Sequence, residues 1–139
     1  MDNLSTDLPA SDNEWQSRLA PERYQILRLK GTEPAFSGDL LNNHESGVFQ
    51  CAGCGAALFS SQDKFDSGSG WPSFTQALDS GVITSQTDHS HAMIRTEIMC
   101  ARCGGHLGHV FNDGPQPTGM RYCVNSLSLE FQESKNAPT

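Results

Sequence analysis

The spacing of apolar positions is helical only near the start of the chain. Ser11 followed three residues later by Glu14 is a capping-box pattern, which predicts a short helix running through Leu19. Pro21 suits the first turn of a second helix, and Gly31 is expected to end it. The sequence therefore predicts two short helices before any strand.

Beyond Gly31 the pattern changes to short strands separated by Gly, Pro, Asn and Asp. Residues 48–51 and 57–59 are expected to form strands on either side of a cysteine pair. Apolar and polar residues alternate along 92–100 and again along 121–131, which predicts two half-buried strands. We therefore expect a mainly β protein with short N-terminal helices.

A chain of 139 residues is the size of one domain. We expect a single folded domain over residues 11–131, with disordered tails at 1–10 and 132–139. Because 16 acidic residues outnumber 9 basic ones, the net charge is −7, which disfavours nucleic acid and anionic membranes as partners. No apolar run is long enough to span a bilayer, and the first ten residues lack a secretory signal pattern, so a cytoplasmic location is expected.

Four of the five cysteines form two Cys-x-x-Cys pairs, each followed by glycine. Two such turns can supply four thiolates to one tetrahedral ion, and the glycine allows the positive φ that each turn favours. Redox-active pairs, reduced buried pairs and an iron site are the alternatives. We predict one structural zinc ion that joins two distant turns and is held by Cys51, Cys54, Cys100 and Cys103.

Cys123 is left over from this set, because four ligands complete a tetrahedral site. A lone cysteine is commonly a small buried apolar residue. Here Arg121 and Asn125 lie two residues away on the same strand face, and Arg121 is about 6.6 Å distant along the strand. A cation at this range favours the thiolate, so the pattern predicts a reactive thiol.

His106 and His109 form a His-x-x-His pair. The pair is interpreted as a catalytic pair, a metal half-site or two unrelated surface imidazoles. In a straight strand the two rings would point to opposite faces, so they converge only if the chain turns, which Gly108 permits. A catalytic pair could transfer protons near neutral pH.

Trp71 lies in a loop between glycine and proline. It is either a core residue or an indole wall for a small apolar group, with Phe111 as a second wall. Residues 113–119 are rich in turn formers and are expected to form a loop at the rim of this site.

Together these segments resemble the B-type methionine sulfoxide reductases, which reduce the R epimer of methionine sulfoxide. The resemblance runs from about Glu14 to Phe131. Its most specific motifs are the two Cys-x-x-Cys turns, Gly70-Trp71-Pro72-Ser73-Phe74, His106-Leu107-Gly108-His109-Val110-Phe111 and Arg121-Tyr122-Cys123-Val124-Asn125-Ser126.

The resemblance implies a β-tent of two antiparallel sheets with short N-terminal helices and a structural zinc site of four cysteines. It implies a repair enzyme for oxidative damage that acts on oxidised proteins or peptides, and we expect a monomer. Cys123 would be the nucleophile and would become a sulfenic acid. By the same resemblance, the polar groups near the sulfoxide oxygen would be His106, His109 and Asn125. The pocket for the substrate methyl group would be formed by Trp71 and Phe111, and Arg121 would support the thiolate.

The sequence departs from a common family pattern at Ser69, where many members carry a resolving cysteine. A serine hydroxyl cannot form a disulfide, and the other four cysteines are assigned to the metal. We therefore expect a cycle that uses one cysteine, in which thioredoxin, glutaredoxin or glutathione reduces the oxidised Cys123 directly.

Two other functions are consistent with the zinc pattern. One is a non-catalytic zinc module that binds a protein partner, since the β-tent is shared with zinc-binding guanine-nucleotide-exchange chaperones. The other is a nucleic-acid zinc ribbon, which the net charge disfavours. Cys123 and the histidine pair favour the enzyme, because a binding module would not require them.

Overall fold

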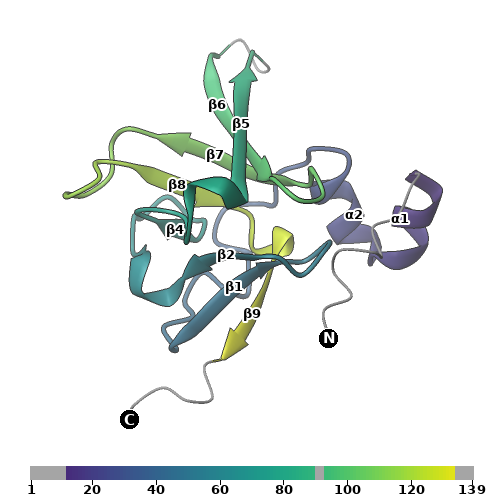
Figure 1. Ribbon diagram of the computed structural model, residues 1–139, viewed down its shortest axis with the longest axis horizontal. Coiled ribbons are helices and arrows are strands. Elements are labelled where there is room, and N and C mark those ends of the chain that lie inside the picture. The colour runs from purple at the N-terminus through teal and green to yellow at the C-terminus, as the bar shows by residue number, and fades with distance from the viewer. Residues whose placement is uncertain (1–11, 90–92, 134–139) are drawn as a thin grey trace.

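The computed structural model describes residues 12–89 and 93–133 and contains two antiparallel sheets with two short helices at one side (Figure 1). The tail predicted at 1–10 lies outside these residues, as do 134–139. The elements are α1 (Asp12–Arg18), α2 (Pro21–Leu27), β1 (Gly47–Cys51), β2 (Ala57–Ser60), β3 (Lys64–Phe65), β4 (Ser73–Phe74), β5 (Ile83–Asp88), β6 (Arg95–Cys100), β7 (His106–Phe111), β8 (Arg121–Val124) and β9 (Leu129–Glu133).

The smaller sheet has the strand order β2-β1-β9, and the larger one has the order β3-β4-β8-β7-β6-β5. Every strand pair in both sheets is antiparallel. The predicted fold class, mainly β with two antiparallel sheets and few short helices, is confirmed. β8 lies inside the larger sheet, between β4 and β7, so side chains on one face of it are close to those of both neighbours.

The expected strand over residues 121–131 is instead two strands in different sheets, separated by a 3₁₀ turn over Ser126–Ser128. The buried carboxylate of Glu33 accepts hydrogen bonds of 2.9 Å from the backbone amides of Ser126 and Leu127. These amides are therefore not available to a neighbouring strand, and the chain leaves one sheet for the other. β9 continues through Glu133, which pairs with Gly47 of β1, so the tail expected at 132–139 is wrong for its first two residues.

Two short helices form in the predicted regions, and Pro21 begins the second. α1 ends at Arg18, one residue before the expected Leu19, and the capping residue Ser11 lies outside the described residues. The left-handed residue after α2 is Lys30, with φ of 62°, and not the expected Gly31. The Gly31 amide instead donates to the carbonyl of Gln25 at 2.9 Å. Among the described residues, neither helix has the length or the apolar character needed to cross a membrane.

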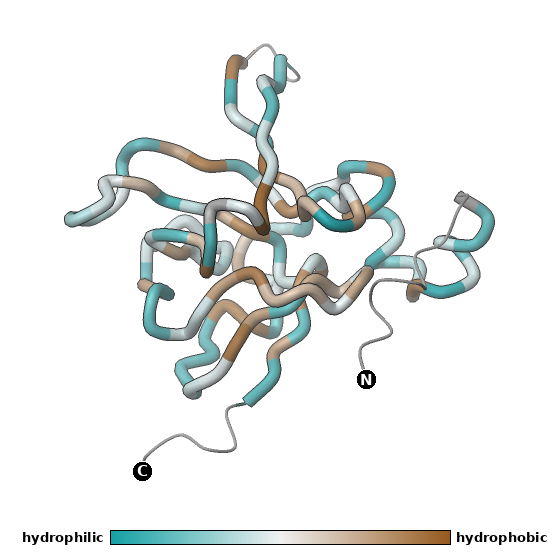
Figure 2. Tube along the Cα trace, viewed as in Figure 1, coloured by the Kyte–Doolittle hydropathy of each residue, from teal (hydrophilic) through white to brown (hydrophobic). Residues whose placement is uncertain are grey.

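The hydrophobic core lies between the two sheets and is built around stacked aromatic rings. Phe59 and Phe74 stack with centroids 4.4 Å apart, and Phe49 meets Phe74 edge-on at 5.1 Å. These rings come from β2, β4 and β1, so they join the smaller sheet to the larger one. Figure 2 shows apolar segments on the central strands and hydrophilic ones in many of the turns.

The strand predicted over 92–100 begins later, at Arg95. Ala92 lies outside the described residues, and Ile94 is 77% exposed. Glu97, which the alternation places on the face opposite Ile98, is buried as Ile98 is. β5 and β6 form a hairpin that extends away from the rest of the molecule (Figure 1).

Candidate active site and metal centre

The four cysteines of the two Cys-x-x-Cys pairs converge at one point, and their sulfur atoms all lie within 4.8 Å of one another. The Sγ atoms of Cys51 and Cys103 are 3.6 Å apart, as are those of Cys54 and Cys100. A tetrahedral zinc site with Zn–S bonds of about 2.3 Å has sulfur–sulfur edges of about 3.8 Å. The residues therefore fit a four-coordinate metal ion.

The two turns that carry these cysteines repeat the same backbone geometry. Gly55 and Gly104, which follow the pairs, have φ of 83° and 76° and donate to the carbonyls of Cys51 and Cys100 at 2.8 Å. This conformation favours glycine, as the sequence predicts. The amide of Gly53 also points at the Cys51 sulfur, 3.3 Å away, and supports its negative charge as a ligand.

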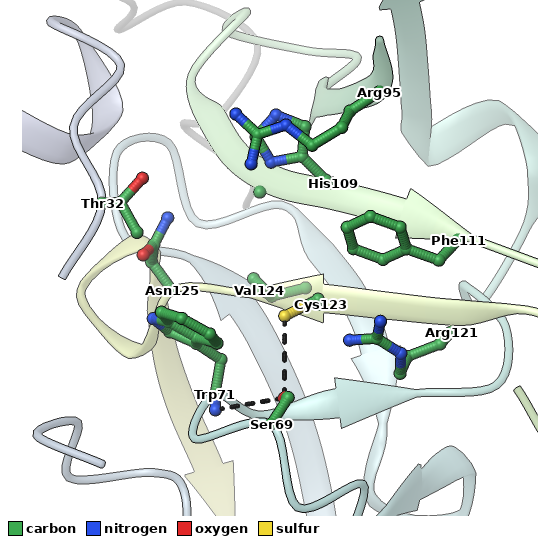
Figure 3. A pocket seen from close by; sticks show the side chains of 11 residues that line it. Thr32, Ser69, Trp71, Arg95, His109, Phe111, Arg121, Cys123, Val124 and Asn125 are labelled. Atoms are coloured by element: carbon green, nitrogen blue, oxygen red, sulfur yellow. Dashed lines mark hydrogen bonds between the residues drawn. The ribbon is translucent and has the colours of Figure 1, made fainter. Parts of the chain in front are cut away.

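A separate cavity of about 230 Å³ contains Cys123, and none of the four clustered cysteines lines it. Figure 3 shows the Cys123 sulfur near the middle of this cavity, with the Trp71 indole on one side and the Phe111 ring on the other. Four more residues singled out in the sequence line the same space: Ser69, His109, Arg121 and Asn125.

The pairing of β8 explains why these side chains meet. Cys123 is opposite His109 of β7 and opposite Ser73 of β4. Residues directly opposite in antiparallel strands have Cβ atoms about 4.5–5.5 Å apart on the same face. His109 is therefore the nearest imidazole to the sulfur by register.

Burial raises the pKa of the Cys123 thiol above its ordinary value, and contacts with Ser69 and Arg121 offset only part of this rise. The sequence pattern predicted the opposite direction because it contained the cation but not the desolvation. The cavity therefore holds Cys123 mainly as a thiol at neutral pH.

Arg121 is anchored by a residue that the sequence analysis placed only in a rim loop. The Nε and Nη2 atoms of Arg121 donate to the two carboxylate oxygens of Asp113 at 2.9 and 3.2 Å. The guanidinium also lies over the Phe111 ring, 4.4 Å from its centroid. This fork fixes the cation beside the cavity.

The two histidines converge without a turn at Gly108. β7 is continuous, but its register with β6 shifts, because Ile98 pairs with Gly108 while Met99 pairs with His106. This β-bulge adds one residue and changes the alternation, which places both imidazoles on one side with centroids 5.7 Å apart.

Each histidine is bound to a carboxylate that sequence reasoning missed. His106 Nδ1 lies 2.7 Å from buried Glu97, and His109 Nε2 lies 2.8 Å from Asp88. His109 lines the cavity, whereas His106 lies behind it and is not among the residues that line it. Burial lowers the pKa of His106, which keeps its ring neutral despite Glu97.

Trp71 and Asn125 are held in place by backbone partners. The Trp71 indole Nε1 donates to the Glu33 carbonyl at 2.9 Å. Asn125 Oδ1 accepts from the Glu33 amide, and its Nδ2 donates to the Leu107 carbonyl. The second N–H of the Asn125 amide takes no part in these two bonds, so this residue both closes the cavity and keeps a donor.

A solved structure shares this fold at low identity. The Mis18 'Yippee-like' domain matches with a TM-score of 0.53 and 20% identity, covering 66% of this chain and all of that domain. At this identity the likeness concerns the fold alone.

The relatives with higher identity are enzymes. The SelR domain family model matches residues 19–133. Peptide methionine sulfoxide reductase MsrB of Leptospira interrogans is 58% identical over 130 residues, covering 94% of this chain and 99% of that protein. The enzyme of the same name from Thiobacillus denitrificans is 56% identical over 128 residues, with 92% and 97% covered. The chain therefore belongs to the B-type methionine sulfoxide reductases, oxidoreductases that reduce methionine sulfoxide in peptides.

Proposed function

We propose that Cys123 is the one cysteine that takes part in the reduction, and that its thiolate attacks the sulfoxide sulfur. Attack forms a transient bond between the two sulfur atoms. In the net step the bond between the substrate sulfur and its oxygen breaks, an oxygen becomes bonded to the Cys123 sulfur, the sulfur–sulfur bond breaks again, and one proton is taken up on that oxygen. The substrate sulfur gains two electrons and becomes a thioether, while the Cys123 sulfur loses two and becomes a sulfenic acid. The observation that carries this proposal is the position of the Cys123 thiol inside the cavity, beside an imidazole and a cation.

The apolar walls of the cavity support binding of a thioether methyl group. Trp71 and Phe111 stand on either side of Cys123 (Figure 3), and burial of one methyl-sized group contributes about 0.8 kcal/mol. The assignment of the R epimer rests on the family resemblance.

The proton that the sulfoxide oxygen needs is assigned to the histidine pair. His109 is opposite Cys123 in the strand register, and the His106 ring lies edge-on to that of His109. General acid catalysis commonly contributes about 10²–10⁴ in rate. Arg121, fixed by Asp113, supports the thiolate once the substrate is bound, and Asn125 offers its second N–H to the sulfoxide oxygen.

The metal is assigned as structural zinc. Four thiolates leave no open position for a substrate, and zinc prefers such a tetrahedral sulfur set. When bound, the ion would tie the turn after β1 to the turn after β6, so Cys51, Cys54, Cys100 and Cys103 would hold together two parts of the chain that are distant in sequence.

Recycling is assigned to an external thiol from thioredoxin, glutaredoxin or glutathione. Ser69 lies next to the nucleophile, with its Oγ 3.9 Å from the Cys123 sulfur. A serine there cannot form a disulfide, and the other cysteines lie in the metal cluster.

A single turnover without reductant tests this cycle. We expect the wild-type protein to lose one free thiol and form no disulfide, because its product is a sulfenic acid at Cys123. The Ser69→Cys variant is expected to form a disulfide with Cys123 after one turnover, since the Ser69 Oγ that the new sulfur replaces lies 3.9 Å from the Cys123 sulfur. Free-thiol counts and peptide mass mapping are the measurements, and an intramolecular disulfide in the wild-type protein would contradict the cycle.

Alanine at either histidine is expected to slow the reduction without loss of metal. For His109→Ala we expect a fall of about 10²-fold or more in kcat/KM, because His109 is opposite Cys123 in the strand register and lines the cavity. For His106→Ala we expect a smaller fall, because its ring lies behind the cavity. Metal content measured on the purified variants is the control, and loss of the metal from either one would mean that the ligand set is misassigned.

A further inference from the structure

Three serine hydroxyls form a hydrogen-bonded chain that begins at Cys123. Ser69 Oγ lies 3.9 Å from the Cys123 sulfur and 2.9 Å from Ser67 Oγ, which in turn lies 2.8 Å from Ser73 Oγ. Ser73 is fully buried and donates to the Trp71 carbonyl at 3.1 Å. The chain thus runs from the reactive sulfur to a backbone acceptor.

The direction of every bond in this chain follows from its end. A carbonyl only accepts, so Ser73 gives its single hydrogen to Trp71. Ser67 therefore donates its hydrogen to Ser73 Oγ, and Ser69 donates its hydrogen to Ser67 Oγ. No hydroxyl hydrogen of the chain is left for the sulfur, so Cys123 must donate its S–H to Ser69.

Backbone amides fill the acceptor positions that remain. The amide of Ser69 donates to Ser67 Oγ at 3.3 Å, and the amide of Trp71 donates to Ser69 Oγ at 3.4 Å, the second contact being drawn in Figure 3. With these bonds each of the two hydroxyls gives one hydrogen and receives two. The arrangement is complete only when Cys123 is protonated.

We propose that Ser67, Ser69 and Ser73 are positioning residues that hold resting Cys123 as a neutral thiol, and that Ser69 reverses its hydroxyl to donate to the sulfur when the thiol ionises. The inference rests on the assignment of Cys123 as nucleophile and deepens it. The thiol proton leaves to solvent or to a neighbouring base, and S–H is the one covalent bond that breaks. The same charged and titratable groups surround the sulfur in every variant compared below: Arg121 of β8, His109 of β7, Arg95 of β6 and Glu33, which precedes β1.

Reversal at Ser69 breaks its bond to Ser67. Buried Ser73 cannot turn its hydrogen away from Trp71 without leaving that carbonyl unpaired, so the reversal stops at Ser67. The thiolate gains a donor while the serine chain loses one bond. Ser67, which does not line the cavity around Cys123, is therefore predicted to oppose ionisation of the sulfur that it never touches.

The test is the pH dependence of alkylation at Cys123, followed on its peptide by mass spectrometry in the metal-loaded protein. Ser67→Ala frees the Ser69 hydrogen for the sulfur and is expected to lower the pH midpoint by about half to one unit. Ser69→Ala removes the donor to the thiolate and is expected to raise the midpoint by a similar amount. The double variant should match Ser69→Ala, because Ser67 acts only through Ser69.

Ser17→Ala, on the exposed face of α1, is the matched control and should leave the midpoint unchanged. Ser73→Ala is a second probe of the same direction, because it releases the Ser67 hydrogen and is expected to lower the midpoint as Ser67→Ala does. An unchanged or raised midpoint in Ser67→Ala, at wild-type metal content, would overturn the proposal. Alkylation requires no turnover, so failure of the proposed reduction cycle would appear separately, as absence of sulfoxide reduction with the shifts intact.

Discussion

Replacement of Cys123 by serine is expected to reduce methionine sulfoxide reduction by at least about a thousand-fold. The serine hydroxyl keeps the shape of the site and ionises far less readily than a thiol, so it supplies no nucleophile at neutral pH. The measurement is the loss of one oxygen atom from a methionine sulfoxide peptide, followed by mass spectrometry.

The matched control for this variant is its metal content. Cys123 stands apart from the four-cysteine cluster, so Cys123→Ser should bind as much metal as the wild-type protein and keep the same near-ultraviolet circular dichroism. Substantial residual reduction by the correctly folded variant would show that another group attacks the sulfoxide.

Removal of the metal by a strong chelator is expected to unfold the domain. A structural zinc site contributes on the order of 10–16 kcal/mol near neutral pH, whereas the net stability of a domain is about 5–15 kcal/mol. A bound ion would join the turn between β1 and β2 to the turn between β6 and β7, so we expect its loss to separate the two sheets at this edge. Near-ultraviolet dichroism and hydrogen exchange report the outcome.

Two comparisons make the chelation result specific. Cys123→Ser should respond to the chelator as the wild-type protein does, whereas Cys54→Ser should be unstable before any chelator is added. A metal-free protein with unchanged near-ultraviolet dichroism would contradict a structural role for the ion.

The local features of the protein were predictable because short-range chemistry controls them. Pro21 begins a helix, and the glycine after each Cys-x-x-Cys pair adopts positive φ, since these conformations depend on the residue itself and its neighbours. The family motifs also predict which residues belong to the cavity, but they do not predict the contacts between those residues.

The errors arose where a distant residue decides the local structure. The strand expected over 121–131 is interrupted because Glu33, which lies 93 residues before Ser126 in the chain, binds two of its amides. The histidines share one side through a bulge whose register depends on β6, and alternation within one segment contains no information on such a shift.

The sequence by itself determined the family, and it singled out four candidate metal ligands and one candidate nucleophile, because these depend on which residues are present and at what spacing. Only the tertiary structure decided how ionisable Cys123 is. Its pKa depends on its burial and on the hydrogen bonds of Ser69, which comes from a loop distant in the chain. Desolvation and the direction of hydrogen bonds are properties of the assembled site. The sequence shows only the neighbouring Arg121, so it predicts a lowered pKa for Cys123, whereas the pKa is raised.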